Sequence, residues 1–216
     1  MQCLQCKTPN RQGAKYCKRC GAALVQSSLA PTADVVDRLI DDLVVPDRIK
    51  DELRKINVLS AQLAKMPVGG RRLSFHTLII GRAGTGKTAI CDVLASIWRA
   101  NGLIKDVTVV EAADYHQKFA KDFEQNFRRA KGGMLVFNDV QKLVPGGYSR
   151  ELDPLDKLFT EMRNSGGDPI VILTGLPRGF NEYVAENPRV KGLFSVVLEL
   201  PDMGVDQLAR VCEKEL

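Results

Sequence analysis

Residues 81–88 combine the residue types and the spacing that best suit chemistry in this chain. They read Gly-Arg-Ala-Gly-Thr-Gly-Lys-Thr, which satisfies the pattern of a phosphate-binding P-loop. The glycines let backbone N–H groups curl around a phosphate, and the ammonium of Lys87 adds positive charge. We therefore expect the phosphates of a nucleotide here, with the hydroxyl of Thr88 directed to Mg²⁺. The residues expected to contact the nucleotide are Gly81, Ala83, Gly84, Thr85, Gly86, Lys87, Thr88 and Ala89.

Four of the six cysteines lie near the N-terminus, in two pairs with two residues between the members of each pair. The pairs are Cys3 with Cys6 and Cys17 with Cys20. Four thiolates make the closed tetrahedral site of structural Zn²⁺, which must supply the folding energy of so short a segment. Two disulfides or a redox pair are the alternatives, and they fit poorly because no secretion signal is visible.

The composition is that of a globular protein, since 44% of the 216 residues are hydrophobic and 26% are charged. No apolar run approaches the roughly 18 residues that a membrane helix needs, so we expect a cytoplasmic protein. The formal net charge is +5, and residues 1–25 hold five basic and no acidic residues. The charge therefore permits nucleic-acid binding only for the zinc module, whose favoured role is to dock a protein partner.

Strands and helices are expected to alternate along the body, with the P-loop between a buried strand and a helix. Apolar runs predict strands over 75–80, 107–110, 134–137, 170–174 and 195–200. Periodic apolar positions predict helices over 87–100, 116–130, 154–163 and 180–186, after two helices between residues 35 and 67. This alternation indicates parallel strands with right-handed crossovers. We expect a P-loop three-layer α/β sandwich preceded by a small zinc ribbon.

From residue 35 onward the chain resembles the AAA+ ATPases, and within them the group of the red-type rubisco activase and the stage V sporulation protein K. The stretches that carry the resemblance are 81–88, 130–137, 155–162, 170–175 and the pair Asn187-Pro188 ahead of Phe194. It implies ATP and Mg²⁺ as ligands and rings, usually hexamers, with ATP at subunit interfaces. It divides the chain into a zinc ribbon (1–24), a linker (25–34), an AAA+ core (35–201) and the start of a truncated helical lid (202–216), so that the lid is largely absent.

The chain departs from the family's catalytic pattern at the end of the third strand. The family has Asp-Glu there, where the Asp holds Mg²⁺ and the Glu polarises the attacking water. This chain has Asn138, which is uncharged, and Asp139, which is one methylene shorter than Glu. Because a displacement of about 1 Å can cost on the order of 100-fold in rate, we expect impaired hydrolysis, with a harmless variation as the alternative. The resemblance implies that the hydroxyl of Thr174 touches the γ-phosphate or the attacking water, with a structural threonine at the end of its strand as the alternative.

Further positions differ from the family or stay open. The arginine that precedes Phe194 in the family, and that reaches the neighbouring subunit's ATP, is replaced by Leu193. Arg189 or Lys191 could substitute for it, although neither occupies the matching position. Phe119 lies near the family's pore aromatic, but phenylalanines recur every four residues there, which is equally typical of a core-facing helix. We expect His76 to be structural and both Cys91 and Cys212 to be buried, inert thiols.

Two functions from different classes remain. The first is an oligomeric remodelling or assembly ATPase whose zinc ribbon docks a client protein. The second is a catalytically impaired nucleotide-binding scaffold or regulatory subunit of a mixed ring. The P-loop supports both, whereas Asn138 and Leu193 favour the second for this chain alone, and a partner subunit could supply the missing arginine.

Overall fold

The computed structural model describes residues 8–9, 18–19, 32–66, 74–111, 119–143, 154–177 and 188–215. The expected zinc ligands Cys3, Cys6, Cys17 and Cys20 lie outside these residues, as do most of the expected linker and the expected helix at 180–186. The P-loop and all five expected strands lie within them.

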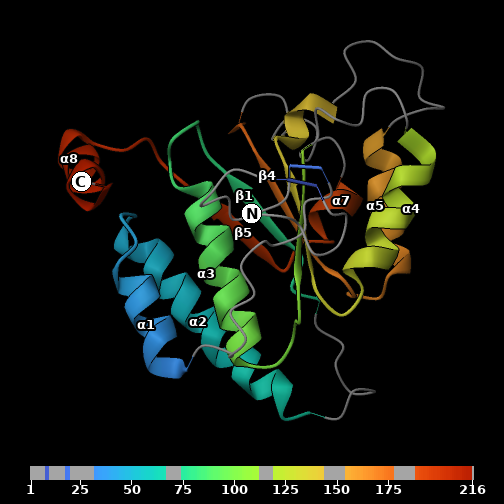
Figure 1. The fold of residues 1–216 in the computed structure, drawn as a ribbon, viewed down its shortest axis with the longest axis horizontal. Helices are drawn as coiled ribbons and strands as arrows, with labels where there is room; N and C mark the ends of the chain where they lie inside the picture. The colour runs from blue at the N-terminus through green and yellow to red at the C-terminus, as the bar shows by residue number, and fades with distance from the viewer. Residues whose placement is uncertain are drawn as a thin grey trace.

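A five-stranded parallel sheet forms the centre of the described chain (Figure 1). Its strands are β1 (Thr77–Ile80), β2 (Val107–Glu111), β3 (Met134–Asn138), β4 (Ile170–Gly175) and β5 (Val196–Glu199). They lie in the order β2-β3-β4-β1-β5, which confirms the predicted α/β fold with parallel strands. Because the strands are parallel, their carboxyl ends meet at one edge of the sheet, where the P-loop follows β1.

Three helices cover one face of the sheet, and Figure 1 shows them on the same side. They are α1 (Ala33–Asp41), α2 (Asp47–Ala64) and α3 (Lys87–Ala100). The middle helix, α3, packs between the sheet and the other two helices, and its Trp98 is fully buried with its ring centroid 5.8 Å from that of Phe75. This packing holds α3, and with it the end of the P-loop, firmly against the sheet.

The opposite face of the sheet is covered by a second set of helices. They are α4 (Phe119–Ala130), α5 (Pro154–Asn164) and the short α7 (Pro188–Lys191). Alternate strand residues divide between the two faces, as a pleated strand requires. Ile79 and Val136 belong to the first apolar core, and Leu78 and Leu135 belong to the second. The molecule therefore has the predicted three layers, with the sheet in the middle.

Helix α4 carries the phenylalanines that recur every four residues, for which the sequence left a pore role and a core role open. Phe127 is buried in the second core, as expected of a core-facing stripe. Phe119 is the first residue of α4, but its side chain lies outside the described part of the chain. Its role in the core or in a pore therefore stays a prediction.

Strand β1 begins two residues later than predicted, and His76 is the physical reason. The N–H of Val171 in β4 donates to Nδ1 of His76 at 3.0 Å. That N–H is therefore not available to a backbone carbonyl of β1, and the regular ladder starts only at Thr77, opposite Ile172.

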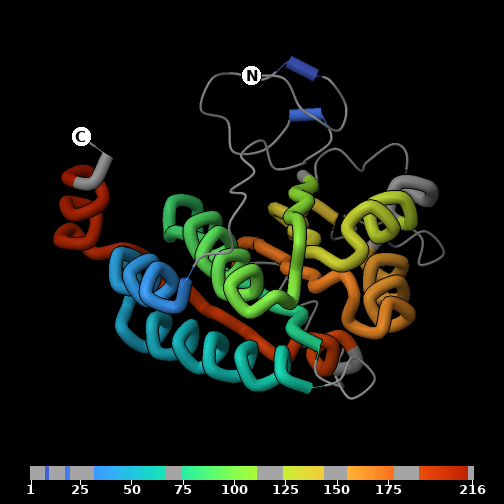
Figure 2. Tube along the Cα trace, turned by 60° about the horizontal axis from the view of Figure 1, so that its bottom comes forward, coloured from blue at the N-terminus to red at the C-terminus, as the bar shows by residue number. Residues whose placement is uncertain are grey.

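Helix α8 (Val205–Glu215) lies in the segment 202–216, where the start of a helical lid is expected. It follows β5 and stands apart from both helical layers in both views (Figures 1 and 2). Val205 is 83% exposed and Leu208 is 50% exposed, so the helix has little apolar burial of its own.

No helix in the described ranges is both long enough and apolar enough to cross a membrane.

Candidate functional site

The P-loop connects β1 to α3, and its shape depends on glycine. Gly84 and Gly86 have φ angles of 81° and 90°, in the left-handed region that glycine adopts without strain. A Cβ added to Gly81 would lie 2.6 Å from Thr85 Oγ1 and 2.9 Å from Leu200 Cβ, so no side chain fits there. The local structure thus requires glycine at the positions where the motif has it.

Lys87 is the first residue of α3, and its ammonium lies against the loop. Its Nζ donates hydrogen bonds to the carbonyl oxygens of Gly81 at 2.7 Å and of Arg82 at 2.8 Å. Partial burial lowers the pKa of Lys87, and the nearby carboxylate of Asp139 opposes that shift. Because the positive end of the α3 dipole points at the same loop, the site attracts an anion.

The residues expected to contact a nucleotide lie together around this loop. Thr85 is buried, and its hydroxyl donates to the carbonyl of Arg82 at 2.8 Å, so this side chain shapes the loop from inside. Gly81 is also buried, and Gly86 and Lys87 are half-buried. The members exposed on the surface are Ala83, Gly84, Thr88 and Ala89.

Asn138 and Thr174 meet at the carboxyl ends of β3 and β4. The hydroxyl of Thr174 donates to Asn138 Oδ1 at 3.1 Å. Thr174 is only 3% exposed, and it pairs in register with Ile79 of β1, next to the P-loop. The structure therefore brings together two of the three expected catalytic side chains. The amide oxygen of Asn138 accepts a hydrogen bond from the hydroxyl of Thr174.

Asp139 follows directly and is held by two neighbours that the sequence analysis missed. Lys142 Nζ lies 2.9 Å from Asp139 Oδ2, and Gln141 Nε2 donates to Asp139 Oδ1 at 3.3 Å. The hydrogen bond from Lys142 is the main cause that lowers the pKa of Asp139. Asp139 has a φ of 60°, a strained value for a residue other than glycine. Oδ1 and Oδ2 of the candidate catalytic carboxylate are both engaged inside the protein.

Gln141 also ties this segment to the neighbouring strand. Its Oε1 accepts the N–H of Leu176, just beyond β4, at 3.0 Å. In the sequence, only position could have indicated these contacts with Asp139, since Gln141 and Lys142 stand two and three residues after it. They lie in a 3-10 helix, η3 (Val140–Leu143), whose tight turn points them back at the carboxylate.

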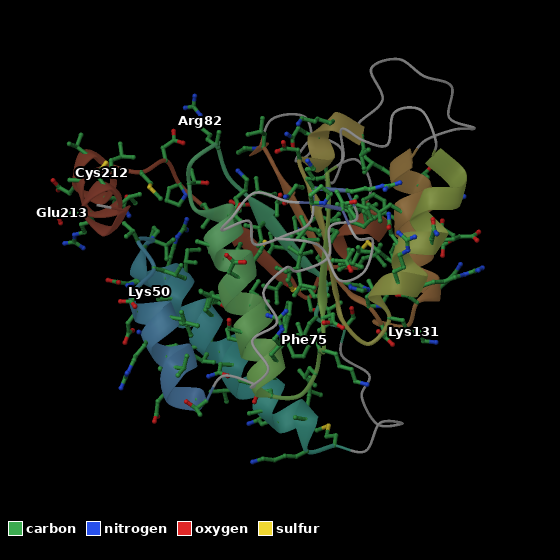
Figure 3. The ribbon with its side chains drawn as sticks, viewed as in Figure 1. Lys50, Phe75, Arg82, Lys131, Cys212 and Glu213 are labelled. Carbon is green, nitrogen blue, oxygen red and sulfur yellow. The ribbon has the colours of Figure 1, made fainter. Side chains whose placement is uncertain are left out.

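Two segments distant in sequence flank the P-loop and were also missed. A Cβ added to Gly86 would lie 3.8 Å from both Val45 Cγ1 and Met203 Cε. Val45 lies between α1 and α2, and Met203 lies between β5 and α8. Arg82 of the loop pairs with Asp202 at 3.1 Å, an exposed contact on the α8 side of the molecule (Figure 3 labels Arg82). Apolar side chains therefore stand beside the loop, as the base of a nucleotide requires.

Leu193, which stands where the family has its arginine, is part of the packed core. Leu193 is half-buried and packs against the second core, and its N–H donates to the carbonyl of Val190 at 3.0 Å. Lys191 is exposed one turn earlier, whereas the side chain of Arg189 lies outside the described residues. Leu193 thus contributes apolar packing where the family pattern has a charged group.

Thr88 is exposed and can direct its hydroxyl to Mg²⁺, but the side chains at the end of β3 fit that ion poorly. Mg²⁺ is bound through one or two carboxylates together with phosphate oxygens and water. Here Asn138 brings no charge, and its oxygen accepts from Thr174, while Asp139 is paired with Lys142. Glu111 ends β2, one strand further from β1 than β3 is. The described residues contain no cluster of His, Cys, Asp or Glu that could hold a metal ion.

A comparison with protein-family models matches residues 77–189 to the ATPase family associated with various cellular activities (AAA). This range spans the P-loop, Asn138, Asp139 and Thr174 and covers more than half of the 216-residue chain.

Curated relatives and solved structures agree with that match. The chain is 20% identical over 191 residues to the stage V sporulation protein K of Bacillus subtilis, covering 83% of this chain and 59% of that protein. It is 22% identical to the chloroplastic ribulose bisphosphate carboxylase/oxygenase activase of Cyanidioschyzon merolae, covering 83% of this chain and 62% of the activase. The chain thus spans less than two thirds of either relative. The FIGL-1 AAA domain has the same fold, with a TM-score of 0.58 at 15% identity over 88% of this chain and 68% of that chain.

Proposed function

This chain belongs to the AAA family of ATPases, and from that membership we propose that it is the ATP-binding module of an oligomeric remodelling or assembly ATPase with weakened hydrolysis. The family implies ATP and Mg²⁺ as ligands, and AAA ATPases typically assemble into rings. The client protein, the partner subunits and a cytoplasmic location are part of the proposal.

The observation that carries nucleotide binding is the position of Lys87. Its ammonium lies on a glycine-shaped loop at the N-terminus of α3, at the carboxyl edge of a parallel sheet, which is where α/β proteins bind phosphates. A solved structure similar to this chain is the FIGL-1 AAA domain in complex with ADP. Val45 and Met203 stand on either side of Gly86 and would contact the base.

Titration with a fluorescent ATP analogue tests this proposal. Lys87→Ala removes the ammonium from the loop and should weaken binding at least about tenfold, or about 1.4 kcal/mol. Lys131→Ala is the matched control, since Lys131 is an exposed lysine that precedes β3 and lies at the opposite end of the strands (Figure 3). Equal affinity in wild type and Lys87→Ala would exclude the P-loop as the site.

The second candidate is a nucleotide-binding scaffold or regulatory subunit that hydrolyses ATP very slowly. Two contacts favour this scaffold function. Asn138 accepts a hydrogen bond from Thr174, and Asp139 pairs with Lys142, so the side chains of Asn138 and Asp139 are engaged within the protein. ATP turnover, measured with and without candidate partner subunits, distinguishes the two functions. Turnover that appears only with a partner supports the scaffold.

The proposal includes a zinc ribbon at residues 1–24 that docks a protein partner. Its support is the spacing of the four cysteines, which suits a tetrahedral thiolate site. Metal analysis of the purified full chain should find about one Zn²⁺ per chain, and Cys17→Ser should remove it while ATP binding persists. A chain purified without zinc would contradict this part of the proposal.

A further inference from the structure

The charges beside the P-loop are unusual for a site that should accept a divalent cation. Two ammonium groups and one carboxylate lie close together there, on Lys87, Lys142 and Asp139. Asn138, at the end of β3, adds no negative charge. The described side chains at the ends of β1 and β3 therefore carry a net positive charge.

We propose that this site binds ATP through its own cations, Lys87 and Lys142, so that its affinity for the nucleotide does not depend on Mg²⁺. The inference rests on the proposed function, namely that the P-loop is the nucleotide site. It goes further by specifying the form of the ligand, which is the triphosphate with or without bound Mg²⁺.

The first support is the state of the two side chains that would face the metal. Asp139 already pairs with Lys142, 2.9 Å away, so a hydrated cation would share its Oδ2 with that ammonium. Asn138 has one side-chain oxygen, and Thr174 already donates to it at 3.1 Å. Loss of the bond from Gln141 to Asp139 would also disturb the bridge to Leu176. Mg²⁺ at these side chains would therefore compete with contacts that join the ends of β3 and β4.

The second support is electrostatic. A divalent cation near Asp139 would face the ammonium groups of Lys87 and Lys142 and a single protein carboxylate, so the phosphates would supply most of the attraction that holds it. The metal-free triphosphate carries more negative charge than its Mg²⁺ complex. The two ammonium groups therefore attract it more strongly and offset the attraction that is lost with the ion.

The experiment is a titration of the full chain with a fluorescent ATP analogue, once with excess Mg²⁺ and once with EDTA at equal ionic strength. We expect the two dissociation constants to agree within about threefold. Binding that weakens about tenfold or more in EDTA would overturn the inference and leave the proposed function intact. The absence of binding under both conditions would overturn the proposed function as well.

Two variants test the same inference independently of each other. Lys142→Met should weaken binding in EDTA several-fold more than binding in Mg²⁺, whereas Lys131→Met, a matched loss of charge at the far end of the strands, should change neither. Asn138→Asp adds the missing carboxylate and should tighten binding in Mg²⁺ relative to EDTA by about 10–100-fold, the usual range for residues that orient a metal. Two results would contradict the proposed role of Lys142 in binding the nucleotide. One is an equal effect of Lys142→Met in Mg²⁺ and in EDTA, and the other is an unchanged ratio of the two dissociation constants in Asn138→Asp. Fluorescence of Trp98, which is fully buried, verifies that each variant is folded.

Discussion

The hydroxyl of Thr174 donates a hydrogen bond to Oδ1 of Asn138 at 3.1 Å and joins the carboxyl ends of β4 and β3 beside the P-loop. A carboxylate at position 138 would have a second oxygen left for a ligand, whereas the amide has an NH₂ group in its place. The contact therefore suits an uncharged site better than a site that binds a cation. The missing charge at Asn138 bears directly on the rate of ATP hydrolysis.

Turnover of ATP by this chain alone should be slow. Asp139 is shorter than Glu and paired with Lys142, and Asn138 is neutral, so we expect a rate below about 1 s⁻¹ at saturating ATP. The double variant Asn138→Asp with Asp139→Glu should be at least about tenfold faster. This gain should be larger when Leu193→Arg is added, because each copy of the chain lacks the arginine that reaches the neighbouring subunit's ATP. A wild-type rate of about 1 s⁻¹ or more, common among enzymes, would show that Asn138 is tolerated.

Gly81→Ala should disrupt the P-loop more than Gly84→Ala. The new Cβ at Gly81 would overlap Thr85 Oγ1 at 2.6 Å and Leu200 Cβ at 2.9 Å, and overpacking of this kind costs about 1–3 kcal/mol. At Gly84 nothing lies within 4 Å, so only the strain of a φ of 81° remains, about 1 kcal/mol. Urea unfolding followed by Trp98 fluorescence measures both costs. A Gly84→Ala variant less stable than Gly81→Ala would refute the steric argument.

Stability should fall in mild acid because of His76. Burial lowers the pKa of His76 from 6.5 to about 4. The folded state therefore binds fewer protons than the unfolded state between these values, so this contribution is present above pH 6.5 and is lost as the pH falls towards about 4. The loss amounts to roughly 3 kcal/mol. Urea unfolding as a function of pH measures it.

His76→Asn is the variant that isolates this effect. Its amide oxygen offers an acceptor to the N–H of Val171 but does not titrate, so the slope of stability against pH should flatten. His116→Asn gives the contribution of the only other histidine in the chain. An unchanged slope in His76→Asn would assign the pH dependence to other groups.

Cys91 should be unreactive in the folded protein. Its side chain is buried in α3, and burial raises the pKa of the thiol to about 12, so almost no thiolate forms near neutral pH. Cys212 is exposed on α8, because this helix has little apolar burial, so the expectation of a buried thiol was wrong there and Cys212 should react readily. Alkylation with iodoacetamide followed by peptide mapping, in buffer and in urea, compares the two. Modification of Cys91 at the rate of Cys212 without urea would contradict the described packing of α3.

The sequence alone determined the features that depend on neighbouring residues. The P-loop is a run of eight residues whose glycines and lysine act through local backbone geometry, and the structure places Gly84, Gly86 and Lys87 accordingly. The alternation of apolar strands and periodic helices predicted the parallel sheet and its two helical layers, because each pattern reports burial of its own segment. The identity of Asn138 was equally plain, and with it the loss of a charge.

Only the tertiary structure decided which side chains meet at the site. A buried strand does not encode its neighbour, so the order β3-β4-β1, and with it the contact between Asn138 and Thr174, was not predictable from local patterns. The same holds for Val45 and Met203, which reach Gly86 from both ends of the body. Lys142 is close to Asp139 in sequence, yet only the turn of η3 brings its ammonium to 2.9 Å from the carboxylate. The residue types came from the sequence. Which of them meet came from the packing of segments far apart along the chain and, for Asp139 and Lys142, from the turn of η3.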